Sequence, residues 1–328
     1  IIYKDLKIFE AINKINRSKI KILFVVDKKN KLLGSVSSGD IRRSIRKKID
    51  PNLPVHELMF TKPKYILKNN TKPLLKESLV CFPIIDKKRR IIDFKITKYI
   101  KKDRPNTIFI MAGGKGSRLL PLTKKTPKPL LKIKGIPIIE KIILGFRNRG
   151  FKNFIISVNY LGYKIKKYLG DGKKIKVNIT YIEEKKFLGT AGSLSLINLK
   201  KTYFPIITTN SDLISEIDYN NLIDYHIKTK SDLTICAKKK NFEMPYGEIL
   251  LDNAKVKKIL EKPVFSHLVN AGVYVINKEL VEKLVKNKKL MMNDFITSQL
   301  KKNKNIYSYP IYEKWIDIGS KLDFYNSR

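Results

Sequence analysis

The stretch from residue 108 to residue 131 combines a glycine-rich loop with two fixed cationic side chains. Four apolar residues at its start predict a buried strand, and three glycines follow directly: Gly113, Gly114 and Gly116. Glycines let the backbone approach a ligand closely and turn its N–H groups towards phosphate oxygens. Arg118 closes the loop, and Lys128 lies between two prolines that favour a stiff, extended segment. The stretch therefore predicts a phosphate-binding loop flanked by two cations.

Two carboxylates further along the chain could hold a divalent cation. Asp212 ends the polar step Asn210-Ser211-Asp212, directly after an apolar segment, and Asp317 lies between two isoleucines. A carboxylate drawn inward needs a cation or hydrogen bonds, and Mg²⁺ prefers one or two carboxylates plus substrate phosphates. We therefore expect Asp212 and Asp317 to bind Mg²⁺. The alternative for Asp212 is a surface residue that caps a helix.

Alternating strand and helix patterns after residue 107 must position these side chains. Apolar runs predict strands at residues 154–158, 179–182, 204–208, 233–237 and 271–276, and helices at residues 138–146 and 163–169. This alternation is typical of an α/β doubly wound sheet. Ligands in such sheets bind at the carboxyl ends of the strands, where the glycine loop and Asp212 both lie.

The glycine loop is part of a longer string of motifs. Gly113-Gly-Lys-Gly-Ser-Arg118 is followed by Pro121-Leu-Thr and then by Pro127-Lys-Pro-Leu. The string is neither a Walker A loop, because no Gly-Lys-Ser/Thr closes it, nor a dinucleotide-binding fingerprint. It resembles the signature of the sugar-1-phosphate nucleotidylyltransferases, with Ser117 where threonine is usual. The resemblance covers residues 107 to about 326. It implies the Rossmann-like, doubly wound mixed sheet of the nucleotide-diphospho-sugar transferase fold.

The resemblance also implies a reaction and a set of site residues. An NTP and the 1-phosphate of a hexose or amino-hexose give an NDP-sugar and pyrophosphate, with Mg²⁺ as cofactor, for surface-glycan or nonulosonic-acid biosynthesis. The implied catalytic residues are Arg118 and Lys128, and the implied metal ligands are Asp212 and Asp317. The implied nucleotide-binding residues are Ala112, Gly113, Gly114, Gly116, Ser117, Glu184, Gly189 and Thr190. The implied sugar-phosphate-binding residues are Gly247, Glu261, Lys262 and Asn270.

A glutamate five residues before Gly189 favours GTP as the nucleotide. In family members that use uridine or thymidine nucleotides, a glutamine at this position reads the base through one donor and one acceptor. A glutamate can only accept, and guanine offers two adjacent donors that one carboxylate can bind together. Glu184, or its neighbour Glu183, therefore predicts a guanylyltransferase, like those for mannose or glucosamine 1-phosphate. The alternatives are a uridylyl- or thymidylyltransferase of the same fold, with the two glutamates in a solvated turn.

Residues 1–104 carry an internal repeat with a period of about 60 residues. Apolar patterns predict helices at residues 5–15, 40–45 and 74–80, and strands at residues 22–26, 32–36, 82–85 and 91–96. The repeat resembles a pair of CBS motifs, a small α+β regulatory domain. Gly34, Ser37 and Asp40 match the family's ligand motif in the first copy, which implies an adenine nucleotide at Ser37 and Asp40. The second copy departs from that motif, so a pairing domain without a ligand is the alternative.

A polar segment at residues 101–106 predicts the linker, so we expect domains at residues 1–104 and 105–328. The net charge of +40 reflects 69 Lys and Arg against 29 Asp and Glu. These basic residues are spread along the chain, which favours attraction of nucleotides and other anions over nucleic-acid binding. Cys81 and Cys236 lie in apolar segments, which predicts buried, reduced thiols.

No apolar stretch is long enough for a membrane span, and nothing resembles a signal peptide. We therefore expect a cytoplasmic homo-oligomer whose N-terminus is trimmed. Two rival hypotheses remain: a catalytically inactive nucleotide-sensing regulator and a nucleic-acid-binding protein. The retained Arg118, Lys128, Asp212 and Asp317 argue against the first, and the absence of a localised basic motif argues against the second.

Overall fold

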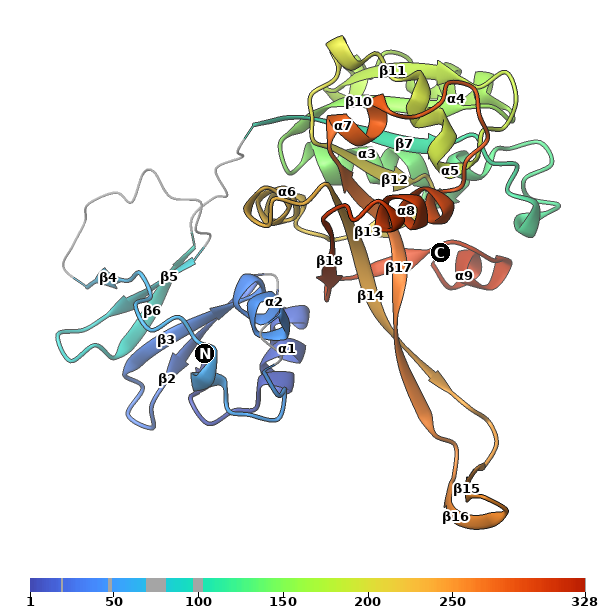
Figure 1. Ribbon diagram of the computed structural model, residues 1–328. Helices are drawn as coiled ribbons and strands as arrows, with labels where there is room; N and C mark the ends of the chain where they lie inside the picture. The colour runs from blue at the N-terminus through green and yellow to red at the C-terminus, as the bar shows by residue number, and fades with distance from the viewer. Residues whose placement is uncertain (19, 47–48, 69–80, 97–102, 328) are drawn as a thin grey trace. The chain divides into compact units, whose positions relative to one another are not determined.

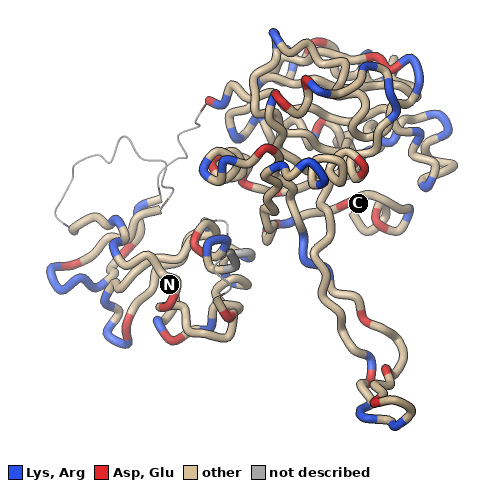
Figure 2. The backbone as a smooth tube through the Cα atoms, in the orientation of Figure 1, with Lys and Arg blue, Asp and Glu red and all other residues tan. Residues whose placement is uncertain are grey.

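The computed structural model describes residues 1–18, 20–46, 49–68, 81–96 and 103–327 (Figure 1). The chain divides into two units, Ile1–Asp103 and Arg104–Arg328. Lys and Arg positions are distributed along the backbone of both units (Figure 2). Among the described residues, no helix combines the length and apolar character that crossing a membrane requires.

The first unit repeats one small sheet twice. In the first copy β1 (Ile2–Tyr3) pairs in parallel with β2 (Ile22–Val26), which forms an antiparallel hairpin with β3 (Leu32–Ser37). The second copy has the same topology in β4 (Ile66–Leu67), β5 (Cys81–Ile85) and β6 (Ile91–Ile96). Helices α1 (Ile8–Arg17) and α2 (Ser38–Arg46) and the 3₁₀ turn η1 (Val55–Glu57) complete the first copy.

The two copies share one hydrophobic core. Buried Phe24 and Leu32 of the first copy belong to the same cluster as Cys81 and Ile85 of the second. The rings of Phe24 and Phe94 are 5.6 Å apart. This shared core confirms the repeat. The helix predicted at residues 74–80 lies outside the described residues.

The second unit is built on a seven-stranded mixed sheet in the order β11-β10-β7-β12-β17-β14-β18. Its strands are β7 (Arg104–Ala112), β10 (Phe151–Val158), β11 (Asn178–Glu183), β12 (Ile206–Asn210), β14 (Leu233–Glu243), β17 (Val264–Ile276) and β18 (Ile306–Ile311). Strands β7, β10, β11 and β12 are parallel, whereas β17 is antiparallel to both of its neighbours. The sheet confirms the predicted fold class.

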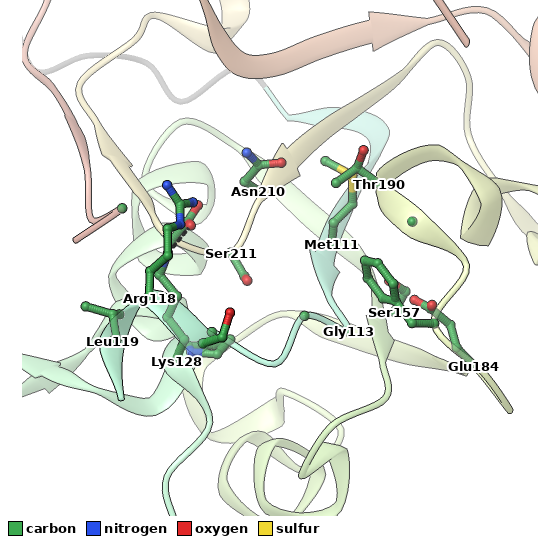
Figure 3. A pocket seen from close by; sticks show the side chains of 18 residues that line it. Met111, Gly113, Arg118, Leu119, Lys128, Ser157, Glu184, Thr190, Asn210 and Ser211 are labelled. Carbon is green, nitrogen blue, oxygen red and sulfur yellow. Dashed lines mark hydrogen bonds and ion pairs between the residues drawn. The ribbon is translucent and has the colours of Figure 1, made fainter. Parts of the chain in front are cut away.

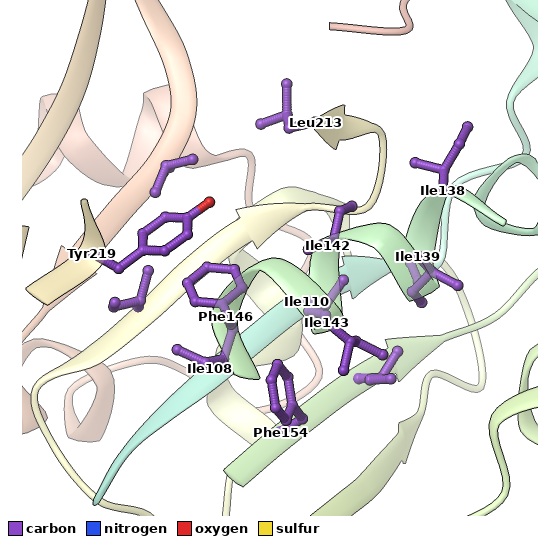
Figure 4. Close-up of a cluster of buried hydrophobic side chains, with 14 of the residues drawn as sticks. Ile108, Ile110, Ile138, Ile139, Ile142, Ile143, Phe146, Phe154, Leu213 and Tyr219 are labelled. Atoms are coloured by element: carbon purple, nitrogen blue, oxygen red, sulfur yellow. The ribbon is translucent and has the colours of Figure 1, made fainter. Parts of the chain in front are cut away.

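Both faces of this sheet are covered, as the near-continuous apolar runs require. Alternation along β7 sends Ile108 and Ile110 to one core and Phe109 and Met111 to the other. Figure 4 shows the first core, where α3 (Ile138–Arg147) packs against β7 and β10. The remaining helices are α4 (Gly162–Leu169), α5 (Gly189–Gly192), α6 (Tyr219–Lys228), α7 (Lys278–Glu282), α8 (Met292–Lys301) and α9 (Lys321–Asn326).

Two predictions about element bounds were wrong. Strand β7 begins at Arg104, inside the expected linker, because the buried Arg104 side chain is satisfied by Asn220 and by Asp224, 2.7 Å away. Strands β14 and β17 are also much longer than expected. They run on past the sheet as a two-stranded arm that ends in β15 (Glu248–Asp252) and β16 (Lys255–Leu260) (Figure 1).

Candidate active site

A cavity of about 300 Å³ opens at the carboxyl ends of β7 and β12 (Figure 3). This is the edge of the sheet at which the sequence predicted a ligand. The lining residues are Met111, Gly113, Gly114, Gly116, Ser117, Arg118, Leu119, Lys128, Pro129, Ser157, Glu184, Phe187, Gly189, Thr190, Asn210, Ser211, Asp212 and Gly319.

The loop after β7 needs glycine at two positions for different reasons. Gly116 has a φ of 66°, in the left-handed region that disfavours other residues. A Cβ on Gly113 would lie 2.8 Å from Oε1 of Glu184. Gly116 turns the chain into η2 (Ser117–Leu119), which carries Arg118. Gly113 leaves room for the side chain of Glu184 to pack against the loop.

Lys128 and Asp212 form an ion pair at the floor of the cavity. Lys128 is only 9% exposed and belongs to the 3₁₀ turn η3 (Lys128–Leu130), so the expected extended segment ends at Pro127. Its Nζ donates a hydrogen bond to Oδ2 of Asp212, which follows β12. A buried cation therefore lies against a carboxylate 84 residues away in the sequence.

Asp317 is brought to Asp212 by a second, two-stranded sheet. Strand β13 (Leu213–Ser215) pairs antiparallel with β19 (Trp315–Asp317), and Leu213 lies opposite Asp317. Loss of hydration and the neighbouring charge of Asp212 raise the pKa of Asp317, while Lys128 and Arg118 oppose that shift. The charges of the two carboxylates therefore repel each other, but Asp317 is exposed at the end of β19 rather than drawn inward as the sequence predicted.

This pair of carboxylates fits a magnesium ion. Oδ1 of Asp212 is buried and accepts no hydrogen bond from any described residue. A buried carboxylate oxygen without a donor is costly unless a cation occupies its free side. The described residues contain no cluster of three or more His, Cys, Asp and Glu that could hold a metal alone. Two carboxylates complemented by substrate phosphates match the preference of Mg²⁺.

Glu184 lies at the opposite side of the cavity and is buried. Its Oε2 accepts a hydrogen bond from the backbone N–H of Leu188 at 2.8 Å, and Asn159 donates to its backbone carbonyl. Burial raises the pKa of Glu184, and the Leu188 N–H lowers it. Glu183 is instead exposed and pairs with Lys166 at the surface. Of the two glutamates, only Glu184 is placed to contact a ligand.

Comparison with protein-family models assigns both parts of the chain. A model described as Nucleotidyl transferase matches residues 107–328, and a CBS domain model matches residues 1–47. The chain belongs to the nucleotidyl transferase family. The family match covers the whole cavity described above.

The relatives of this transferase include guanylyltransferases. The chain is 34% identical over 226 residues to mannose-1-phosphate guanyltransferase of Saccharomyces cerevisiae, covering 66% of this chain and 62% of the relative. It is 30% identical to the catalytic subunit beta of mannose-1-phosphate guanylyltransferase of Drosophila melanogaster, covering 66% and 60%. Among solved structures, HddC from Yersinia pseudotuberculosis matches with a TM-score of 0.55 and 25% identity, covering 68% and 97%. The chain thus spans under two thirds of the length of these curated relatives.

All of the predicted catalytic, metal-binding and nucleotide-binding residues line the cavity except Ala112 and Asp317. Ala112 is buried in β7, and Asp317 ends β19 opposite Leu213, where it is exposed. Sequence reasoning missed Ser157 and Phe187 as lining residues. Ser157 could have been found, because it is a polar residue near the carboxyl end of a predicted strand. Phe187 carries no such signal.

The predicted sugar-phosphate residues are not brought to the cavity. Gly247, Glu261 and Lys262 belong to the arm, because β14 and β17 continue beyond the sheet instead of turning at its edge. Asn270 lies inside β17 rather than at its start, and its side chain bonds Asn293 and the Gly272 N–H.

The predicted CBS ligand residues have a structural role. Oδ2 of Asp40 accepts hydrogen bonds from the N–H and the hydroxyl of Ser37, which closes a capping box at the start of α2. Oδ1 pairs with Arg43. Binding of an adenine nucleotide at Ser37 and Asp40 stays a prediction, and the structure adds that such a ligand must compete with these bonds.

Proposed function

We propose that the transferase domain condenses GTP with a sugar 1-phosphate, from a hexose or an amino-hexose, to give a GDP-sugar and pyrophosphate. The observation that carries this proposal is the arrangement of one cavity. A glycine loop, a buried lysine, the carboxylate of Asp212 and a buried glutamate line it, and Asp317 is close enough to Asp212 for their charges to interact. The names of the relatives, which are guanylyltransferases, support GTP as the nucleotide.

The chemistry needs positioning and charge neutralisation rather than a general base. A sugar phosphate has its second pKa near ~6, so it is already ionised at pH 7. Its oxygen attacks the α-phosphorus in line, a new P–O bond forms, and the bond to the β-phosphate oxygen breaks to release pyrophosphate. In this proposal Lys128 holds the α-phosphate, while Arg118 and the loop amides hold the departing phosphates.

Asp212 and Asp317 are the proposed ligands of Mg²⁺. When bound, the ion supplies a positive charge that neutralises the triphosphate. The orphaned Oδ1 of Asp212 supports this assignment.

Glu184 is the proposed reader of the guanine base. Its Oε2 is fixed by Leu188, which holds the carboxylate in one orientation across the cavity from Lys128. A fixed carboxylate can accept from both the N1–H and the 2-amino group of guanine. The rival proposal, a uridylyl- or thymidylyltransferase, would leave this acceptor facing a carbonyl of the pyrimidine.

The test is pyrophosphate release with Mg²⁺, across GTP, UTP, dTTP, CTP and ATP, against a panel of hexose and amino-hexose 1-phosphates. Turnover with GTP alone supports the proposal. Turnover with UTP or dTTP keeps the reaction and refutes the role of Glu184. Nucleotide binding without turnover on any acceptor supports the rival hypothesis of an inactive nucleotide sensor.

A further inference from the structure

One buried hydroxyl at the cavity has no hydrogen-bond partner. Ser157 is the penultimate residue of β10 and is only 1% exposed, yet it lines the cavity. Its Oγ makes no hydrogen bond to any described residue. A buried polar atom without a partner is costly, and native proteins keep few of them. Phosphate binding and metal binding do not use this hydroxyl, so it needs an explanation of its own.

Ser157 lies beside the proposed base reader. The backbone N–H of Glu184 donates to the carbonyl of Val158, the residue after Ser157, at 2.9 Å. The Ser157 hydroxyl is near enough to Glu184 to lower the pKa of its carboxyl group, although hydrogen-bond geometry does not join the two. Figure 3 shows both residues at the same side of the cavity. The two side chains can therefore contact the same part of a ligand.

The surroundings of Ser157 suit a flat heterocycle. Its partner on β7 is Met111, and paired residues of neighbouring strands share one face of a sheet. Met111 and Phe187 add apolar surface to the cavity. The charged pair Lys128 and Asp212 lies apart from Ser157 in Figure 3. The base of a nucleotide is therefore expected at the side of Ser157, and its phosphates at the side of the charged pair.

The chemistry of guanine identifies the atom that this hydroxyl would meet. One edge of guanine presents the 2-amino group, N1–H and O6 side by side. The carboxylate of Glu184 can accept from the two donors, which leaves O6, an acceptor, without a partner. A serine hydroxyl can donate, and its single side-chain torsion lets it turn towards the base.

We propose that Ser157 completes the recognition of guanine by donating a hydrogen bond from its hydroxyl to O6, next to the contacts of Glu184 with N1–H and the 2-amino group. This inference rests on the proposed use of GTP. It makes Ser157 a specificity-determining residue whose hydroxyl gains a partner when the nucleotide binds.

The experiment measures the Kd of the full chain for GTP, UTP and 6-thio-GTP by calorimetry, with Mg²⁺ and without a sugar phosphate. Ser157→Ala removes only the hydroxyl. We expect its Kd for GTP to be at least about fivefold higher than that of wild type, because O6 loses its donor. 6-thio-GTP keeps N1–H and the 2-amino group, but sulfur is a weak acceptor, so its Kd should change by less than about twofold.

The matched control is Ser193→Ala. Ser193 is also buried with an Oγ that has no described partner, but it does not line the cavity. The control should leave the Kd for GTP unchanged. Without nucleotide, both variants should unfold at a Tm no lower than that of wild type, because neither loses a hydrogen bond.

Each contrary outcome has a distinct meaning. Unchanged binding of GTP by Ser157→Ala would overturn the inference and leave the proposed function intact. Equal weakening of GTP and 6-thio-GTP, or a Tm below that of wild type, would also overturn it, because the hydroxyl would then hold Glu184 rather than the base. Wild type that binds UTP more tightly than GTP would refute both the use of GTP and the role of Ser157.

Discussion

At the scale of single residues, the candidate site depends on groups removed from water. Lys128 and Asp212 compensate each other, and removing one leaves the other as an uncompensated charge. Sequence motifs identified both residues but could not show that they touch. The contact forms because β7 and β12 are neighbours in the sheet, so the segments that follow them lie side by side. The types and the sequence spacing of the two residues do not reveal this neighbourhood.

Replacing Lys128 tests its contact with the α-phosphate. We expect Lys128→Ala to lower kcat by a factor of about 10²–10³, the usual loss for one preorganised electrostatic contact. The matched control is Lys132→Ala, an exposed lysine on the short strand β8 (Lys132–Ile133), which should leave turnover unchanged. Steady-state pyrophosphate release measures both, and unimpaired turnover in Lys128→Ala would remove the proposed role.

Replacing Glu184 tests base selection. Glutamine keeps one acceptor and adds a donor, so Glu184→Gln should lose a hydrogen bond to guanine and gain one to a pyrimidine carbonyl. We expect kcat/KM for GTP to fall by about 10-fold or more and the ratio of UTP to GTP turnover to rise. An unchanged ratio of the two rates would contradict base reading by Glu184.

The same residue predicts a pH dependence of stability. The pKa of Glu184 is raised in the folded state by burial, so folding favours its protonated form. The stability it contributes is complete below its unfolded pKa and is lost as the pH rises through the folded one. Glu184→Gln should therefore have a higher Tm than wild type at pH 7, and the difference should shrink as the pH is lowered. Thermal unfolding from pH 4 to pH 8 without nucleotide measures this, and a constant difference would contradict it.

At the scale of elements, the sequence predicted the sheet well and the arm poorly. Buried strands such as β10 and β12 are apolar runs that hydrophobic patterning detects. The outer part of β14 is instead mostly polar and exposed, and backbone pairing with β17 holds it extended. Patterning detects burial rather than backbone pairing, so both strands were predicted too short. The same extension places Gly247, Glu261 and Lys262 on the arm instead of at the cavity, and their contact with a sugar phosphate stays a prediction.

The glycine loop allows a sharp test at this scale. Gly113→Ala places a methyl group against Glu184, whereas a Cβ on Gly114 meets nothing within 4 Å. We expect Gly113→Ala to raise KM for GTP by about 10-fold or more, because displacing a positioned group by a fraction of an ångström weakens binding. Gly114→Ala is the matched control, and equal effects of the two substitutions would show that the contact with Glu184 is unimportant.

At the scale of the whole molecule, the excess of lysine and arginine over acidic residues extends to exposed positions next to the cavity. Lys115, Lys185 and Lys186 are exposed and adjoin lining residues in the chain. A basic rim attracts an anionic triphosphate from a distance, and salt screens that attraction.

We expect kcat/KM for the nucleotide to fall as salt is raised from about 50 to 300 mM, with kcat changing little. Replacing the three rim lysines by glutamine should flatten this dependence. Lys200, Lys201 and Lys228 are exposed lysines that do not adjoin lining residues, and their replacement by glutamine is the control. Equal salt dependence in both triple variants would show that the rim does not steer the substrate.

The ion pair at the cavity floor has a thermodynamic consequence. Each partner stands in for a component of the substrate complex: Lys128 takes the place of the metal at Asp212, and Asp212 takes the place of a phosphate at Lys128. A metal arriving alone at the open Oδ1 of Asp212 meets the like charge of Lys128, and a phosphate arriving alone at Lys128 meets the like charge of Asp212. When both arrive together, each neutralises the charge that repels the other. With Asp212 as the proposed metal ligand, the two components therefore bind cooperatively, and each strengthens the affinity for the other by the same factor.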